Sequence, residues 1–147
     1  MVRVYVDMVG DLFHYGHTEM LRRARELGDE LLVGVCGDLT VEGYKRRPVM
    51  ALEERVRVIQ ACRYVDLVWV DCPLRLSEAD IAEWNIDLVV HGDDWSEEKL
   101  REDYGASMRL GKFRALPATP MISTSDIIAR VIKRADDLAP SVAGKLG

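Results

Sequence analysis

The chain is poor in cysteine and contains no long hydrophobic run, and both absences exclude classes of protein. Its three cysteines, Cys36, Cys62 and Cys72, are odd in number and widely spaced, without a CxxC pair. We therefore expect buried, reduced thiols and neither a zinc site nor a disulfide framework. No apolar stretch reaches the roughly 18 to 20 residues that cross a bilayer, and an apolar strand pattern begins almost at residue 1. These features predict a cytoplasmic protein with no signal peptide and no membrane partner.

Positive charge and phosphate-binding glycine motifs are also scarce. Lysine and arginine number 20 against 25 acidic residues, and the net charge of −5 argues against a nucleic-acid partner. There is neither a GxGxxG motif nor a Walker-type loop, which disfavours dehydrogenases and P-loop kinases. The 147 residues contain no internal repeat, low-complexity tract or linker. We expect one folded domain over residues 1–138 and a weakly ordered tail over residues 139–147.

What the chain does contain is an alternation of strand and helix patterns joined by short connections. Short apolar runs predict strands at residues 2–6, 31–35, 67–70, 87–90 and 113–116. Helical periodicity is present at residues 18–27, 51–65, 77–84, 97–112 and beyond 122. We expect a break at Gly105, and a buried face on the last helix made by Ile127, Ile128, Val131 and Ile132. The alternation predicts an α/β fold, with a parallel sheet that carries helices on both faces.

The turn from the first strand into the first helix is rich in polar groups that suit an anion. Residues 11–17 read Asp-Leu-Phe-His-Tyr-Gly-His. Free backbone N–H groups and the helix dipole favour negative charge at such a turn, and Gly16 lets a ligand approach the backbone. His14 and His17 can donate to phosphate oxygens and stabilise charge that moves during phosphoryl chemistry. Spacing alone equally allows two turn histidines without a chemical role.

Three more polar segments follow later strands, so a parallel sheet would gather them at the same edge. Residues 45–47 are three successive cations, residues 92–95 carry two aspartates, and residues 122–126 place three hydroxyl side chains at a helix start. Each segment also has a simpler interpretation, as solvated surface, a turn or an N-cap cluster. Together with the two histidines they suit a nucleotide.

These motifs resemble those of the HxGH nucleotidyltransferase superfamily. Residues 14–17, His-Tyr-Gly-His, match its HxGH signature, and residues 122–125, Ile-Ser-Thr-Ser, are similar to its second signature. The closer resemblance is to cytidylyltransferases that act on phosphocholine, phosphoethanolamine and glycerol 3-phosphate. It rests on residues 33–38, 44–45, 49–50, 54–55, 63–66 and 92–95, in family order between residues 4 and 134. The resemblance implies a Rossmann-like α/β fold of the nucleotidyltransferase (HxGH) type.

The resemblance also implies an activity and a set of site residues. CTP and a small phosphorylated alcohol or phosphonate would give a CMP-activated product and pyrophosphate, with Mg²⁺ on the triphosphate and no dedicated protein metal site. The catalytic residues would be His14, His17 and Lys45. The nucleotide would contact Val9, Gly10, Asp11, Gly16, Gly92, Asp94, Thr119, Ile122, Ser123 and Thr124, and the acceptor would contact Asp38, Arg63 and Trp95. A homodimer is also implied. The alternatives are an adenylyltransferase of the same superfamily and a non-catalytic nucleotide-binding module.

Two departures from the family pattern concern the walls of the site. Met8 stands where a glycine is usual before the first histidine, a change that Gly10 can offset. Leu74 stands where phosphocholine enzymes have a tryptophan for cation–π contact. Trp69, Trp95 and Tyr104 are available to line a different pocket. We therefore expect an acceptor that is smaller or less cationic than phosphocholine.

A third departure removes a positive charge. The family's second signature usually includes an arginine, but this chain has Ala118 before Thr119. The resemblance makes that arginine a cation for the triphosphate. Arg46, Arg47 and Arg114 are the candidates to replace it.

Overall fold

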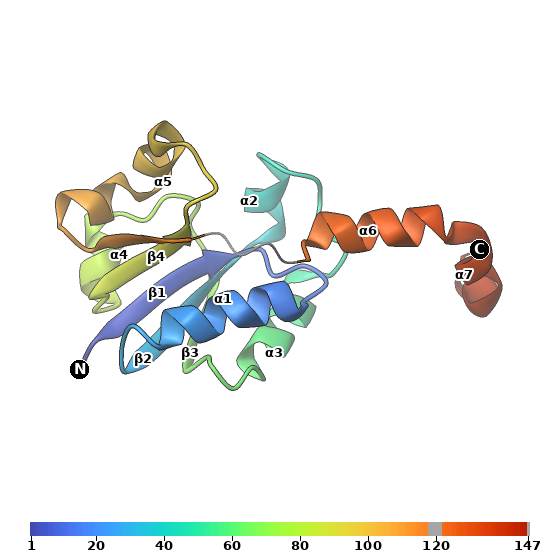
Figure 1. The fold of residues 1–147 in the computed structure, drawn as a ribbon, viewed down its shortest axis with the longest axis horizontal. Coiled ribbons are helices and arrows are strands. Elements are labelled where there is room, and N and C mark those ends of the chain that lie inside the picture. The colour runs from blue at the N-terminus through green and yellow to red at the C-terminus, as the bar shows by residue number, and fades with distance from the viewer. Residues whose placement is uncertain (118–121, 147) are drawn as a thin grey trace.

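The computed structural model describes residues 1–117 and 122–146, and its centre is a five-stranded parallel sheet (Figure 1). The strands are β1 (Arg3–Met8), β2 (Glu30–Cys36), β3 (Leu67–Cys72), β4 (Leu88–Gly92) and β5 (Phe113–Leu116). They lie in the order β3-β2-β1-β4-β5. The order reverses at β1, and the carboxyl ends of strands at such a reversal are where open α/β sheets bind ligands.

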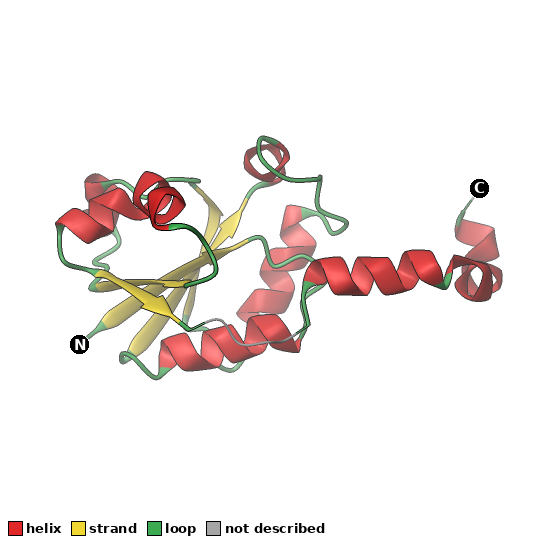
Figure 2. Ribbon diagram, turned by 45° about the horizontal axis from the view of Figure 1, so that its top comes forward, coloured by secondary structure: helices red, strands yellow, loops and turns green. Residues whose placement is uncertain are grey.

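Helices cover both faces of this sheet, which confirms the predicted α/β class. The helices of the described residues are α1 (Tyr15–Arg25), α2 (Asp38–Glu42), α3 (Leu52–Gln60), α4 (Glu78–Glu83), α5 (Glu97–Arg109), α6 (Thr124–Lys133), α7 (Ala135–Leu138) and the 3₁₀ helix η1 (Ala139–Lys145). The α1 and α3 helices pack on one face, and α2, α4 and α5 pack on the other (Figure 2). Within the described residues, no helix is long and apolar enough to cross a membrane.

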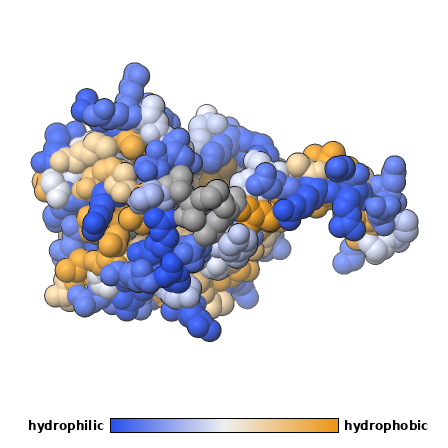
Figure 3. Space-filling model, in the orientation of Figure 1, coloured by the Kyte–Doolittle hydropathy of each residue, from blue (hydrophilic) through white to orange (hydrophobic). Residues whose placement is uncertain are grey.

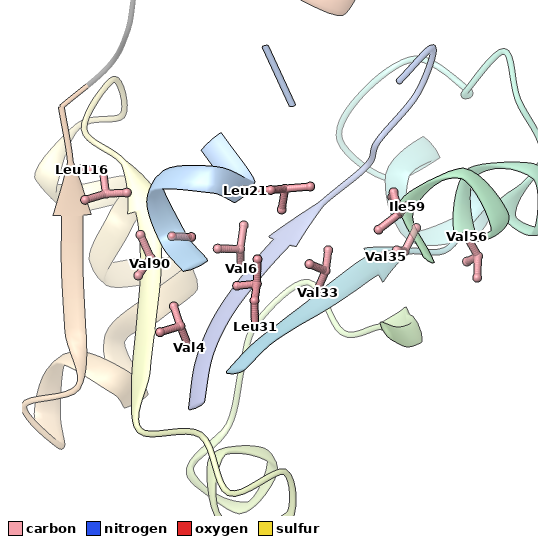
Figure 4. Packing of buried hydrophobic residues seen from close by; sticks show 11 residues of the cluster. Val4, Val6, Leu21, Leu31, Val33, Val35, Val56, Ile59, Val90 and Leu116 are labelled. Carbon is pink, nitrogen blue, oxygen red and sulfur yellow. The ribbon is translucent and has the colours of Figure 1, made fainter. Parts of the chain in front are cut away.

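Alternating strand side chains build a core on each face of the sheet. On β1, Val4 and Val6 belong to the cluster that includes Leu21 of α1 and Ile59 of α3 (Figure 4). Tyr5, which lies between the two valines, belongs to the opposite cluster with α4 and α5. Successive strand residues point to opposite faces. Because both faces are covered, the strands form nearly continuous apolar runs in the sequence.

Three helices differ from the sequence prediction. The expected break at Gly105 is wrong, because α5 runs without interruption from Glu97 to Arg109. Its neighbours Tyr104 and Ala106 are buried, and the packing of that face outweighs the roughly 1 kcal/mol that a glycine costs a helix. The α3 helix ends at Gln60, before the predicted residue 65, and α2 is a short helix where the sequence predicts a loop.

The expected buried face of the last helix is wrong in its second half. The α6 helix projects away from the sheet (Figures 1 and 2), and its surface includes hydrophobic residues (Figure 3). Ile127 and Ile128 are half-buried, but Val131 and Ile132 are 51% and 70% exposed. An amphipathic pattern predicts that a helix has an apolar face, without saying that its own domain covers that face. The weakly ordered tail over residues 139–147 stays a prediction, and residues 139–145 form η1.

Candidate active site

A cavity of about 740 Å³ opens at the carboxyl ends of β1 and β4, beside the reversal of strand order. The turn after β1, the start of α1, the loop before α3, the end of β4 and the start of α6 line it. This nucleotide cavity, as we name it, gathers thirteen of the predicted site residues: Val9, Gly10, Asp11, His14, Gly16, His17, Lys45, Gly92, Asp94, Trp95, Ile122, Ser123 and Thr124.

His14 and His17 form a reciprocal cap at the N-terminus of α1. The Nδ1 atom of His14 accepts a hydrogen bond from the Gly16 N–H at 3.1 Å. The Nδ1 atom of His17 accepts one from the His14 N–H at 3.2 Å, and the two ring centroids are 3.9 Å apart. A capping box of this kind satisfies backbone donors that a helix start leaves free. Both imidazoles are therefore held at the helix start by the backbone itself.

These hydrogen bonds also decide where the imidazole protons lie. Each Nδ1 atom accepts a bond, so the proton of each neutral ring is on Nε2. The Nε2 atom of His14 lies 3.2 Å from the Thr124 hydroxyl, which itself donates to the Asp11 carbonyl at 3.0 Å. His14 is thus the donor to Thr124. Among the described residues nothing accepts the Nε2–H of His17, which lines the cavity and can donate to an anionic oxygen.

Burial keeps both imidazoles neutral at neutral pH. Burial, and secondarily the neighbouring His14, lowers the pKa of His17 to about 4. Burial also lowers the pKa of His14, although the Asp126 carboxylate opposes this shift. An anion in the cavity would favour the charged form of both rings. The pair is therefore neutral before a ligand binds and able to respond to negative charge.

Two glycines permit close contacts around the histidine turn. Gly10 has a φ angle of +70°, a left-handed conformation, and a Cβ atom there would lie 2.6 Å from Cδ1 of Ile59. A Cβ atom on Gly16 would lie 2.4 Å from the Ile122 carbonyl oxygen. Only glycine lets the starts of α1 and α6 approach so closely.

The groups that the start of α6 leaves available to a ligand are backbone N–H groups. The hydroxyl groups there already have partners. Ser123 is the N-cap and accepts from the Asp126 N–H at 3.1 Å. The Thr124 hydroxyl donates to the Asp11 carbonyl. The backbone N–H groups of Thr124 and Ser125 have no acceptor among the described residues. They remain available for an anion at the positive end of the helix dipole.

A buried arginine holds the loops beneath the nucleotide cavity. Arg55 is 0% exposed, and its guanidinium donates to the carbonyls of Val9, Cys36 and Met50 and to the Asp38 carboxylate, at 2.6 to 3.1 Å. These bonds connect the ends of β1 and β2, the loop before α3, and α2. The positions of the cavity walls therefore depend on one charged side chain that is not itself part of the lining.

Asp11 has a similar positional role. Its carboxylate is buried and accepts the backbone N–H groups of Val49 and Met50, each at 2.9 Å. The turn after β1 is thereby tied to the loop before α3. Asp11 lines the cavity, but its carboxylate oxygens already accept these two backbone hydrogen bonds.

Two of the predicted site residues, Asp38 and Arg63, are not brought to the nucleotide cavity. Asp38 lies at the start of α2, and its carboxylate pairs with Arg55 at 2.6 Å without lining the cavity. Arg63 is exposed in the turn before β3, at the opposite edge of the sheet. Thr119 lies outside the described residues. The sequence alone does not show that Asp38 faces Arg55, because the contact depends on the packing of α2 over β2.

A second cavity, of about 80 Å³, adjoins the first and has acidic and aromatic walls. Asp7, Lys45, His91 and Trp95 are among the residues that line both cavities. Asp7 of β1 accepts a hydrogen bond from the Tyr104 hydroxyl at 2.6 Å. The rings of His91, Trp95 and Tyr104 form one cluster, with centroids 4.3 to 6.4 Å apart. We call this space the acidic pocket.

The two carboxylates of the acidic pocket differ in how their charge is balanced. Asp103 is 2% exposed and forms ion pairs with Lys99 at 3.2 Å and Arg75 at 3.5 Å. Asp7 has no lysine or arginine partner among the described residues, and burial raises its pKa although the Tyr104 hydroxyl bonds to it. A half-buried carboxylate without a cation, such as that of Asp7, is stabilised by a positive group that binds beside it.

Sequence analysis missed Asp7 and Asp103 as pocket residues, and two of its three aromatic candidates line the pocket. Asp7 carries a visible signal, since it is a carboxylate inside an apolar strand. Asp103 carries none, because it stands among many charged residues of α5. Trp95 and Tyr104 do line the pocket, whereas Trp69 stacks on Trp84 away from it.

No resident metal centre is visible in the part of the chain that the structure describes. There, no group of three or more histidine, cysteine or carboxylate side chains could hold an ion. All three cysteines are free, and Cys36 and Cys72 are buried.

A parallel α/β sheet with two capping histidines at its switch-point cavity defines a protein of the nucleotidyltransferase type. The chain belongs to the cytidylyltransferase-like family, whose sequence profile matches residues 10–130. The matched region includes the histidine turn, the end of β4 and the start of α6. The resemblance drawn from the motifs is therefore confirmed.

Curated relatives narrow the comparison to two related groups of enzymes. The chain is 44% identical to an ethanolamine-phosphate cytidylyltransferase of Arabidopsis thaliana, over 88% of this chain and 32% of the relative. It is 39% identical to an ethanolamine-phosphate cytidylyltransferase of Dictyostelium discoideum, over 98% of this chain and 40% of the relative. It is 40% identical to choline-phosphate cytidylyltransferase A of Rattus norvegicus, over 92% and 38%. The chain thus spans between a third and two fifths of the length of these relatives.

Solved structures support the fold. A lipopolysaccharide core biosynthesis protein from Thermoplasma volcanium superposes with a TM-score of 0.62 at 24% identity, covering 84% of this chain and 99% of the other. A pantothenate synthetase from Thermus thermophilus superposes with a TM-score of 0.54, at 17% identity, over 100% and 71%. At these identities the likeness concerns the fold alone.

Proposed function

We propose that the chain is a CTP-dependent cytidylyltransferase whose acceptor is the phosphate ester of a small amino alcohol, of the phosphoethanolamine type. The observation that carries the proposal is that the nucleotide cavity adjoins the acidic pocket. His14, His17 and Arg46 line only the first, and Asp103 and Tyr104 line only the second. The half-buried carboxylate of Asp7, which has no lysine or arginine partner among the described residues, lines both. A phosphorylated amino alcohol has a phosphate end and an ammonium end that match the two cavities. The relatives named for ethanolamine phosphate and choline phosphate support the same class.

The proposed reaction is an in-line displacement at the α-phosphorus of CTP. An oxygen of the acceptor phosphate attacks, and a new P–O bond forms. The bond from the α-phosphorus to the bridging oxygen breaks, and its electron pair leaves with pyrophosphate. Because no bond to the protein forms, the protein contributes positioning and charge stabilisation.

The groups around the nucleotide cavity fit that task. The Nε2–H of His17 and the free N–H groups at the start of α6 would donate to the phosphate oxygens of CTP. Lys45 lines both cavities and would contact both the acceptor phosphate and the α-phosphate. Negative charge grows on the leaving pyrophosphate, so pre-placed donors stabilise the transition state more than the ground state.

Mg²⁺ would enter as part of the nucleotide substrate. Mg²⁺ keeps several waters and is commonly held by substrate phosphates with one or two carboxylates. Asp94 is a carboxylate on the lining of the nucleotide cavity. Among the described residues, it forms no ion pair with an arginine or a lysine. The cavity therefore fits a Mg²⁺–CTP complex without a metal centre of its own.

The acidic pocket would select the acceptor. Asp7 would pair with the ammonium group, and Trp95 and Tyr104 would border it with their rings. The small volume of about 80 Å³ favours a compact ammonium group. A phosphonate of the same shape would react equally, because the attacking oxygen is the same.

Pyrophosphate release tests the proposal directly. The protein is incubated with Mg²⁺, CTP or ATP, and one acceptor from a panel. The panel contains phosphoethanolamine, phosphocholine, glycerol 3-phosphate and 2-aminoethylphosphonate. We expect release with CTP and with the acceptors that carry a primary ammonium group, at higher kcat/KM than with glycerol 3-phosphate.

Three outcomes would contradict parts of this assignment. Release with ATP alone would identify an adenylyltransferase. CTP binding without turnover on any acceptor would identify a nucleotide-binding module. A preference for glycerol 3-phosphate would leave the reaction in place but refute the role of the acidic pocket. Light scattering of the same sample would test the homodimer that the family resemblance implies.

A further inference from the structure

Arg46 joins the basic loop to the start of α6 at the edge of the nucleotide cavity. Its Nη1 atom lies 3.4 Å from the Ser125 hydroxyl oxygen, and both residues line the cavity. The two residues are 79 positions apart in the chain. Among the described residues, no carboxylate forms an ion pair with Arg46. The guanidinium therefore brings an unneutralised positive charge to this edge.

The other two cations of the loop are placed differently. The Lys45 ammonium lies 5.6 Å from the centre of the Tyr44 ring and faces the junction of the two cavities. Arg47 is 77% exposed, pairs with Glu42 at 3.4 Å and does not line the cavity. Two adjacent arginines thus differ in one respect that matters here, which is access to the site.

Arg46 brings its charge close to other positive groups at the start of α6. Its charge approaches the N-terminal turn of α6, where the helix dipole and the free N–H groups of Thr124 and Ser125 are also positive. The acidic group of that turn, Asp126, accepts the Ser123 N–H at 2.8 Å. An anion between the guanidinium and the helix start would satisfy both positive groups at once.

We propose that Arg46 binds the β- and γ-phosphates of the nucleotide against the start of α6 and takes up the charge of the departing pyrophosphate. This inference rests on the proposed function. It also assigns the cation that Ala118 does not provide, because Arg47 is paired outside the cavity and Arg114 does not line it. Arginine suits the task, since its planar fork can donate two parallel hydrogen bonds to phosphate.

The test compares nucleotides that differ only in their terminal phosphates. Calorimetry measures the binding of CTP, CMP and inorganic pyrophosphate to the wild-type chain and to Arg46→Ala, Arg46→Lys and Arg47→Ala. In Arg46→Ala we expect the affinity for CTP and pyrophosphate to fall roughly 10- to 100-fold, as for loss of charge-assisted hydrogen bonds. CMP affinity should change less than about 2-fold. Arg46→Lys should recover part of the loss, and Arg47→Ala should match the wild type.

The same variants separate this inference from the proposed function. Equal loss of CTP and CMP affinity in Arg46→Ala, or equal behaviour of the two alanine variants, would overturn the role of Arg46. The second result would point to Arg23, another cation on the lining, whose guanidinium donates to the Pro117 carbonyl at 2.8 Å. A wild-type chain that binds ATP in place of CTP would refute the proposed function. The comparison of ATP with AMP would then still test Arg46.

Discussion

The nucleotide cavity and the acidic pocket share Lys45, His91 and Trp95 on their walls, yet they are built in different ways. The first relies on backbone donors and neutral imidazoles at two helix starts. The second relies on the charge of a half-buried carboxylate, that of Asp7, near the end of a strand. Backbone donors serve any phosphate, whereas a fixed negative charge distinguishes one acceptor from another. The comparison predicts that changes in the first cavity alter turnover, and changes in the second alter acceptor choice.

The largest effect is expected from His17→Ala. Loss of an Nε2–H donor to the triphosphate should lower kcat roughly 100- to 1,000-fold for every acceptor alike. The variant also loses one half of the α1 cap, so its free energy of unfolding should fall by about 1 kcal/mol. Steady-state kinetics and thermal unfolding measure the two effects. Tyr15→Ala, at an exposed position of the same turn, is the matched control. A fall in kcat with only one acceptor would contradict the separate roles of the two cavities.

A smaller and selective effect is expected from Asp7→Asn. The amide keeps an oxygen that can accept from the Tyr104 hydroxyl but removes the negative charge. The KM for phosphoethanolamine should rise roughly 10- to 100-fold, while that for CTP stays within about 2-fold. The KM for glycerol 3-phosphate, which has no ammonium group, should rise much less. Asp29→Asn, where the carboxylate accepts the Val2 N–H, is a control far from the site. An equal rise in KM for both acceptors would show that Asp7 does not bind the ammonium group of the acceptor.

Tyr104→Phe should have a weaker effect in the same direction. The ring remains against His91 and Trp95, but the hydrogen bond to Asp7 is lost. Loss of that bond raises the pKa of the Asp7 carboxyl further and reduces the fraction that is charged. We expect the KM for phosphoethanolamine to rise roughly 3- to 10-fold at neutral pH, and less at higher pH. An unchanged pH profile of KM would contradict this account.

The smallest effect changes no rate and is seen by NMR. The Cε1–H signal of His17 should titrate with a pKa of about 4 in the free chain. The folded pKa lies below the unfolded value of about 6.5, so the neutral ring's contribution to stability is complete above pH 6.5 and is lost as the pH falls toward 4. Binding of CTP should raise this pKa, because the triphosphate favours the imidazolium. A pKa that does not move on binding would place the triphosphate away from His17.

The sequence predicted the parts of the nucleotide cavity better than those of the acidic pocket. The five strands, the histidine turn and an N-cap within residues 123–125 were predictable, because they depend on residues within a few positions of one another. The acidic pocket was not, because Asp7 and Tyr104 are 97 positions apart. The exposed half of α6 was also missed, since periodicity shows an apolar face but not what covers it.

By itself, the sequence determined the alternation of strands and helices, the HxGH turn and the family to which the chain belongs. These follow from local hydrogen bonding, helical spacing and strand periodicity, which act over a few residues. Only the tertiary structure decided that Asp7 accepts a hydrogen bond from Tyr104 and that Arg46 reaches Ser125. The same is true of the ion pair between Asp38 and Arg55. The reason is that strand order and helix packing set which distant side chains meet, and no local pattern records that choice.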